Sequence, residues 1–502
     1  MTPGFEAYAR LEEAFRRHAL IEETIGVLHW DMAVMMPPGG ARARAEQIAD
    51  LRVLAHDMLT HERLAEDLAA AESDATGLDS WQAANLREMW RIWHHANALP
   101  SDLVAARSRA TSECETVWRT ARPRSDFRAL RPSLEEVVRL TREAGVAKSE
   151  AFGRPLYDAL MDEYEPDADA RRVIVMLEDY AAFLPAFLDE VLATQARRCV
   201  PAEPPGPFSV ADQKRLCRLM AETVGLDFDS ARMDESLHPF STGIADDSRI
   251  TTRYNKADYS EALMGVLHES GHAMYERGLP RDWHRQPVGD ARGMTLHESQ
   301  SLLIEMQICR SRRFFEWAAP VIAKAFRASG PAWTPDNLYR LATRVRPGFI
   351  RVDADEVTYP AHIVLRTRLE MALMAGDLVV ADLPGAWRDG LTELLDITPP
   401  DDRLGCMQDV HWPDGNFGYF PTYTLGAMAA AQLAAAARTA EPGIMSAIGR
   451  GDFTPLMRWL RSHVHGKGSL LSTDELLCEA TGSPLDAAVF KAHLRDRYLE
   501  AA

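Results

Sequence analysis

The sequence has few cysteines, no excess of positive charge and no long apolar run. Its six cysteines are scattered over 502 residues without a C-x-x-C pair, which argues against a disulfide framework and favours a reducing compartment. A formal net charge of −18 disfavours nucleic acid and anionic membranes as partners. No stretch approaches the roughly 18 apolar residues of a spanning helix, and no basic-then-apolar leader opens the chain. We therefore expect a cytoplasmic protein with no nucleic-acid or membrane partner.

Helical periodicity is what the sequence does contain. Apolar residues recur at spacings of three and four through most of the first half, as in "LRVLAHDMLTHERLAEDLAAAE", which is typical of amphipathic helices. Proline and glycine interrupt this pattern at "VPAEPPGPFS", residues 200–209. With 46% hydrophobic residues the chain can bury a large core. We expect an N-terminal helical lobe over about 1–205 and a second lobe over 206–502.

Two further stretches suggest how the chain packs. "DSRITTRYN" (residues 247–255) alternates β-branched residues with arginines, and we interpret it as an edge strand along a cleft that could bind an extended peptide. A solvated hairpin with surface arginines fits the pattern equally well. The alanine-rich stretch 425–438 is too short and too weakly hydrophobic to span a membrane, so it predicts a closely packed helix.

The stretch "GVLHESGHAMYERG" (residues 265–278) carries the clearest chemical pattern. Asp258 and Glu261 have the spacing of a capping box, which predicts a helix start. Gly278 and Pro280 predict its end. The whole stretch is therefore expected to lie on one helix.

On that helix, His268 and His272 are four residues apart and share one face. Two imidazoles at this spacing can bind one zinc ion, and Glu269 is placed to take a proton from a metal-bound water. The simpler interpretation is a helix with two hydrogen-bonded, partly buried histidines.

A hydrolytic zinc site needs a third protein ligand and an open position for water. Glu298, on the next predicted helix, could be that ligand. Its spacing from Thr295 also fits a capping box, so Glu298 could instead cap its own helix. His297 is a rival ligand, although it points about 100° away from Glu298 around the helix.

Five motifs occur in an order that resembles a known family. They are "DSRIT" at 247–251, "HESGH" at 268–272, "HESQ" at 297–300, "IRVDADEVTYPAH" at 350–362 and "GCMQDVHW" at 405–412. "HPFSTG" at 238–243 and "WDMAVMMPPGGARARAEQ" at 30–47 extend the match over nearly the whole chain. The sequence thus resembles the carboxypeptidase Taq family of zinc metallocarboxypeptidases.

This resemblance implies a fold, a metal and a reaction. The fold is mostly α, a single peptidase domain over 1–502 with two lobes, a deep central groove and a small β-sheet near the active site, similar to neurolysin and angiotensin-converting enzyme. The metal is Zn²⁺, for which Co²⁺ can substitute, with His268, His272 and Glu298 as its ligands. Glu269 is the general base and later proton shuttle. The resemblance also implies a homodimer.

The implied reaction removes single C-terminal residues from peptides. Such an enzyme must recognise a free carboxylate, which the planar fork of arginine does well. The family motif points to Arg351, with Arg249 as second candidate. Without the resemblance, a salt bridge between Arg351 and Asp353 or Asp355 would be the preferred interpretation.

Other residues in the motifs receive looser roles. The tetrahedral oxyanion needs a hydrogen-bond donor, which His411, Tyr419 or Tyr423 could supply, although aromatic residues at this density are more often part of a core. The remaining substrate-binding candidates are His238, His362, Gln408 and Tyr419.

Three other functions remain open at this point. An endopeptidase or a dipeptidyl carboxypeptidase would share the helical fold and the H-E-x-x-H helix. A peptide-binding protein without catalysis would keep the groove, but the intact metal-binding set argues against it. A structural zinc site would be expected to use cysteines, and none adjoins the motif. For an enclosed cleft, we expect the helices of residues 1–150 to form a wall or lid that excludes folded proteins.

Overall fold

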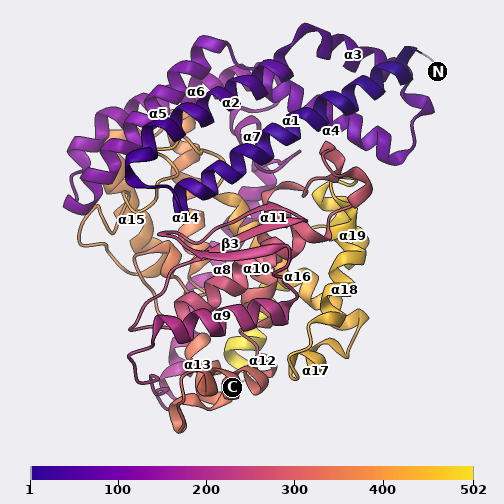
Figure 1. Cartoon of the computed structure of the whole chain (residues 1–502). Helices are drawn as coiled ribbons and strands as arrows, with labels where there is room; N and C mark the ends of the chain where they lie inside the picture. The colour runs from indigo at the N-terminus through magenta and orange to yellow at the C-terminus, as the bar shows by residue number, and fades with distance from the viewer. Residues whose placement is uncertain (1–2, 501–502) are drawn as a thin grey trace. The chain divides into compact units, whose positions relative to one another are not determined.

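A computed structural model describes residues 3–500 of the chain. In that range the protein is mostly α-helical with a small three-stranded sheet (Figure 1), which confirms the expected fold class. The contacts separate two compact units, each built from three segments. Segments of the two units alternate along the chain, so neither unit corresponds to a single stretch of sequence. The expected lobes at 1–205 and 206–502 stay a prediction.

The first unit comprises Met1–Ala96, Pro201–Ala342 and Ala429–Asp486. It contains the sheet and the part of α16 (Pro421–Ala440) that follows Met428. Its further helices are α1 (Pro3–Val34), α2 (Ala41–Thr60), α3 (Glu62–Ser73), α4 (Ser80–Asn97), α9 (Val210–Val224), α10 (Ser260–Gly278), α11 (Gly293–Leu302), α12 (Arg312–Ala325), α13 (Pro335–Ala342), α17 (Ile444–Ile448), α18 (Thr454–His463) and α19 (Thr473–Thr481).

The second unit comprises Asn97–Val200, Thr343–Met428 and Ala487–Ala502. Helices α6 and α8 pack against α14, whose first residues form the end of the motif at 350–362. Its helices are α5 (Ser101–Ala121), α6 (Phe127–Phe152), α7 (Leu156–Met161), α8 (Ala170–Ala196), α14 (Tyr359–Ala375), α15 (Leu383–Leu395) and α20 (Ala487–Arg495).

The N-terminal helices are held together by their apolar faces. Tyr8, Leu11 and Phe15 recur on one side of α1, as the three- and four-residue spacing predicts. They pack with Leu68 of α3 and Met89 of α4 in one buried cluster. The periodicity in the sequence therefore identifies this core correctly.

The sheet consists of β1 (Ala231–Glu235), β2 (Ser241–Ile244) and β3 (Asp247–Thr252), in the order β1-β3-β2. Strand β3 pairs in parallel with β1 and antiparallel with β2. The expectation that 247–255 forms an edge strand is therefore wrong, because neighbours occupy both of its sides. The last strand in sequence became the central one, a non-sequential order that alternation within a single strand cannot reveal.

The alanine-rich segment is a packed helix, as predicted. Ala430, Leu433, Ala434 and Ala437 of α16 are fully buried, and small side chains let neighbouring elements approach closely. Among residues 3–500, no helix is both long and apolar enough to cross a membrane.

Candidate active site

The motif HESGH lies on α10, which packs on α9, β3 and α11 (Figure 1). The helix ends at Gly278 as predicted, but the capping box does not form. Asp258 accepts hydrogen bonds from the backbone N and the Oγ of Ser260, at 2.8 and 2.6 Å, while Glu261 pairs with Arg253. The start of α10 is therefore stabilised by a local turn.

Helix α11 brings Glu298 to the two histidines of α10. His268 Nε2 lies 3.8 Å from Glu298 Oε1, and His272 Nε2 lies 3.6 Å from Glu298 Oε2. Ligand atoms of the three residues all lie within 4.8 Å of one another. The N-cap of α11 is Arg292, without a side-chain cap hydrogen bond, so Glu298 does not cap its helix.

These distances fit a bound zinc ion. They are too long for hydrogen bonds, but they are close to the separation of roughly 3.3 Å between tetrahedral ligands that each lie about 2.0–2.1 Å from zinc. Two imidazole nitrogens and a carboxylate oxygen are also a donor set found at catalytic zinc sites. The residues present therefore fit the metal that the sequence predicts.

The close crossing of α10 and α11 depends on Gly271, the fourth residue of the motif. A Cβ atom at this position would lie 2.5 Å from the carbonyl oxygen of Gln300 and 2.6 Å from the Cα of Ser301. Both atoms belong to the backbone of α11, which cannot rotate away. Glycine at 271 thus lets Glu298 reach the histidines.

Glu269, beside His268 on α10, is buried with 6% of its surface exposed. Burial is the main reason that the pKa of Glu269 rises to about 7, and the carboxylate of Glu298 adds to this rise while His268 opposes it. A carboxyl group with this pKa can both accept and return a proton near neutral pH.

The two histidines differ in their electrostatic surroundings. Burial would lower the pKa of His268, but the carboxylates of Glu298 and Glu305 outweigh it and raise this pKa to about 10. Burial, with the neighbouring histidines, keeps the pKa of His272 well below its ordinary value. A metal ion bound by His268, His272 and Glu298 would therefore have to displace a proton from His268, whereas His272 is already neutral and can bind it directly.

Glu305 is a residue that the sequence analysis missed. It lies in a π-helical turn, η6 (Leu303–Ile308), that follows α11 and also packs on α10. Its Oε2 atom lies 3.0 Å from His268 Nδ1, and its Oε1 atom accepts a hydrogen bond from Arg310 at 2.6 Å. The available signal was its position seven residues after Glu298, on nearly the same helical face.

His297, the rival ligand, lies beside the group but is bonded elsewhere. Its Nε2 atom lies 2.9 Å from Glu276 Oε1, and its ring stacks on that of His272 with centroids 4.5 Å apart. The group that meets metal-binding geometry contains Glu298 and not His297.

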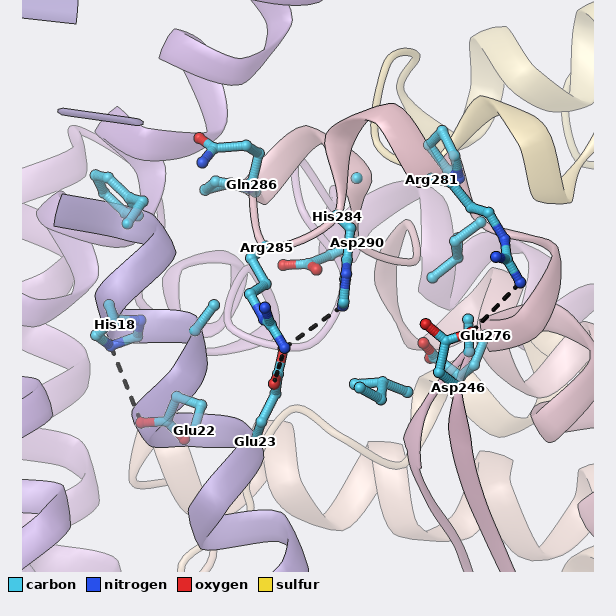
Figure 2. A pocket seen from close by; sticks show the side chains of 18 of the residues that line it. His18, Glu22, Glu23, Asp246, Glu276, Arg281, His284, Arg285, Gln286 and Asp290 are labelled. Atoms are coloured by element: carbon cyan, nitrogen blue, oxygen red, sulfur yellow. Dashed lines mark hydrogen bonds and ion pairs between the residues drawn. The ribbon is translucent and has the colours of Figure 1, made fainter. Parts of the chain in front are cut away.

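A cavity of about 460 Å³ lies beside the C-terminal half of α10 (Figure 2). Glu276, one helical turn after His272, lines it. Across the cavity, Glu23 of α1 accepts hydrogen bonds from Arg285 at 2.8 and 3.0 Å. These bonds tie α1 to the segment that connects α10 with α11. Other charged or ionisable lining residues are His18, Glu22, Asp246, Arg281, His284 and Asp290.

In the second unit, Arg351 belongs to a buried ion-pair network. Its Nε and Nη2 atoms donate to Asp409 Oδ1 at 3.1 and 2.9 Å, and its Nη1 donates to the hydroxyl of Tyr359 at 3.0 Å. Asp409 also accepts two hydrogen bonds from the buried Arg366. The partner of Arg351 is thus Asp409, and not Asp353 or Asp355 as the simple interpretation of the sequence expected.

The candidate oxyanion donors lie close to this network. Nε2 of His411 is 3.3 Å from the hydroxyl of Tyr423, and the guanidinium carbon of Arg351 lies 4.9 Å from the Tyr423 ring centroid. Tyr419 packs edge-on against Tyr423. Burial lowers the pKa of His411 to about 4, so its imidazole is neutral near pH 7. The structure brings Arg351, His411, Tyr419 and Tyr423 together, while their roles stay predictions.

Gln408 and His362 are buried around the same network. The Gln408 side chain accepts a hydrogen bond from the backbone N of Arg351 at 2.9 Å and donates to three carbonyl oxygens, including that of Phe349. Gln408 therefore orders the segment that carries Arg351. His362 is fully buried, and burial, with the nearby charges of Arg366 and Arg351, lowers its pKa to about 3.

The two remaining candidates lie in the first unit. The Arg249 guanidinium packs 4.3 Å from the Trp30 ring centroid and pairs with Asp247 at 2.6 Å, which favours a structural role in holding α1 on the sheet. His238 lies exposed in the loop between β1 and β2, where its carbonyl accepts a hydrogen bond from Ser236. Their substrate-binding roles stay predictions.

Two histidines four residues apart, a glutamate from a crossing helix and a buried carboxylate beside the first histidine define a metallopeptidase type of site. The chain belongs to the Carboxypeptidase Taq (M32) metallopeptidase family, whose model matches residues 10–498. This confirms the predicted family, so the protein is a metallocarboxypeptidase, a hydrolase that acts on peptides.

Individual relatives match over nearly their full length. Thermostable carboxypeptidase 1 of Thermus thermophilus is 37% identical, over 99% of both chains. The structure of Trypanosoma cruzi metallocarboxypeptidase 1 has a TM-score of 0.96 and 38% identity, covering 98% of this chain and 99% of that one. An M32 carboxypeptidase from Deinococcus radiodurans has a TM-score of 0.93 and 32% identity, over 99% of both chains.

Proposed function

We propose that this metallocarboxypeptidase uses zinc, bound by His268, His272 and Glu298, to remove single residues from the C-termini of peptides. The observation that supports the proposal most is that ligand atoms of these three residues, two from α10 and one from α11, lie within 4.8 Å of one another. Glu269 is next to the first histidine in the sequence. Cobalt, with similar ligand preferences, is expected to substitute for zinc.

Glu269 is proposed as the general base and proton shuttle. A bound zinc ion would polarise the scissile carbonyl and lower the pKa of a water molecule to about 7. The carboxylate of Glu269 accepts the proton that this water loses as it attacks. Because the pKa of Glu269 is about 7, the same carboxyl group can then give the proton to the departing amine.

Arg351 is proposed to bind the free carboxylate of the substrate, which restricts cleavage to the C-terminus. The hydrogen bonds to Asp409 and Tyr359 orient its guanidinium before substrate arrives, and preorganisation reduces the entropy cost of binding. Tyr423 and the neutral His411 are proposed as donors to the oxyanion. Homodimer formation and a cytoplasmic location stay proposals that rest on the family and the composition.

Replacing Glu269 with glutamine tests the mechanism without removing a ligand. The variant should bind zinc with the stoichiometry of the wild type but lose turnover, because an amide cannot accept the proton. Metal content measured by atomic absorption, together with hydrolysis of a short peptide, separates the two effects. Near-normal turnover in Glu269→Gln would contradict the mechanism.

Replacing Glu298 or His297 with glutamine tests the ligand assignment. We expect Glu298→Gln to lose zinc affinity and His297→Gln to keep it, since only Glu298 faces both histidines. Loss of zinc in His297→Gln, with retention in Glu298→Gln, would reverse the assignment.

A further inference from the structure

The ring of His268 lies between two carboxylates that are seven residues apart, Glu298 in α11 and Glu305 in the π-helical turn that follows it. Its Nε2 atom faces Glu298 at 3.8 Å, and its Nδ1 atom lies 3.0 Å from Glu305 Oε2. We propose that Glu305 is a positioning residue for the metal centre: it accepts the Nδ1–H bond of His268 and so holds the Nε2 lone pair toward the metal. The inference rests on the proposed function, because it assumes that His268 is a ligand.

The carboxylate of Glu305 is itself fixed at both oxygens. Arg310 donates to Oε1 at 2.6 Å while Oε2 faces His268, so the carboxylate plane cannot turn without breaking one of these contacts. Arg310 is tied in turn to the carbonyl of Ala342 at 3.1 Å. The side chain of Glu305 is 10% exposed, which limits competition from water for the hydrogen bond to His268.

The backbone at Glu305 departs from α-helical geometry. In the π-helical turn Leu303–Ile308, the N–H of Cys309 donates to the carbonyl of Ile304 at 2.9 Å, an i to i+5 bond. One such turn shifts all later side chains relative to a regular helix, and π turns are frequent at functional sites. Glu305 lies inside this turn. The direction of its side chain therefore depends on the π-helical backbone as well as on its spacing of seven residues from Glu298.

The other histidine ligand is held by a different means. The ring of His272 meets the backbone of His297 and stacks on the ring of the same residue, with centroids 4.5 Å apart. His268 is therefore the ligand whose tautomer is set by a carboxylate. An outer carboxylate of this kind orients the ring and raises its basicity, and its loss weakens metal binding 10- to 100-fold in known sites.

The chain offers a matched control in Glu276. Its Oε1 atom lies 2.9 Å from Nε2 of His297, so it forms the same type of pair on a histidine that adjoins the metal group without belonging to it. Replacing Glu276 with glutamine removes a carboxylate from a neighbouring imidazole but leaves His268 untouched. Any general effect of lost negative charge near the site should appear in both variants.

The experiment compares the full-length wild type with Glu305→Gln and Glu276→Gln. Zinc affinity is measured by competition with a chromophoric chelator, and the visible absorption spectrum of the cobalt-loaded protein reports ligand geometry. We expect Glu305→Gln to bind zinc 10- to 100-fold more weakly and to show an altered cobalt spectrum, while Glu276→Gln matches the wild type in both. Circular dichroism checks the fold.

Each other outcome overturns a specific claim. Wild-type affinity and spectrum in Glu305→Gln would refute the positioning role, as would an equal loss in Glu276→Gln. If Glu305→Gln fails to fold, Arg310→Lys replaces it, with a smaller loss of affinity expected and no change as the refuting result. Unchanged zinc binding in His268→Ala would instead refute the proposed metal centre itself.

Discussion

Replacing Gly271 with alanine should weaken metal binding by moving α11 away from α10. The new methyl group would lie 2.5 Å from the carbonyl oxygen of Gln300 and 2.6 Å from the Cα of Ser301. Since ordinary contacts begin near 3.4 Å, α11 must shift by roughly 0.8 Å to relieve the clash. Glu298 lies on the same helix, two residues before Gln300, and would move with it.

That shift is large compared with what a metal ligand tolerates. Ligand distances must stay within about 0.2 Å of their ideal values, so we expect at least a tenfold loss of zinc affinity, or about 1.4 kcal/mol. Overpacking should also cost about 1–3 kcal/mol of folding stability. Alanine's better helix propensity offsets up to about 1 kcal/mol of this cost.

Gly265 provides the control on the same helix. A Cβ atom there would lie 3.6 Å from Thr252 Oγ1 and 3.9 Å from Pro239, which are ordinary contacts. Gly265→Ala should therefore keep its zinc affinity and gain about 0.4–1 kcal/mol of stability. Chelator competition and thermal unfolding measure both quantities. Wild-type zinc affinity in Gly271→Ala, or an equal loss in Gly265→Ala, would refute the reasoning.

Three further predictions concern the ionisable groups. The value of kcat/KM should fall on an acid limb at or below about pH 7, because only ionised Glu269 accepts a proton and burial raises its pKa to about 7; a flat profile between pH 5 and 8 would contradict this role. Asp409→Asn should cost about 3–5 kcal/mol in urea unfolding at pH 7, since two buried arginines lose their partner. Although burial alone would raise the pKa of Asp409, Arg351 and Arg366 hold it far below its ordinary value, so the stability it contributes is present above about pH 4 and is lost in stronger acid. Arg351→Lys should raise KM for peptides at least tenfold, through loss of the planar fork, with zinc affinity unchanged; an unchanged KM would remove Arg351 from substrate binding.

The centre of the candidate site could be predicted because its geometry is local. His268, Glu269 and His272 lie within five residues of one helix, where spacing alone places the two histidines on one face. Glu298 was harder, because the sequence allowed it to cap its own helix. The family resemblance favoured it as a ligand, and the structure shows it facing both histidines.

Residues that act through long-range contacts could not be predicted. Asp409 lies 58 positions from Arg351, and local sequence instead suggested an ion pair with a nearby aspartate. Glu305 meets His268 only because η6 and α10 pack together. The prediction of an edge strand at 247–255 failed for a related reason, since β3 also pairs with β1, which is not its neighbour in the sequence.

The most direct test of the central claim is a time course of peptide products. The purified protein is incubated with a peptide blocked at its N-terminus, with and without a chelator, and the products are followed by mass. We expect successive losses of single C-terminal residues, abolished by the chelator and restored by zinc or cobalt. Internal fragments, losses of two residues at a time, or cleavage that persists without metal would contradict the account.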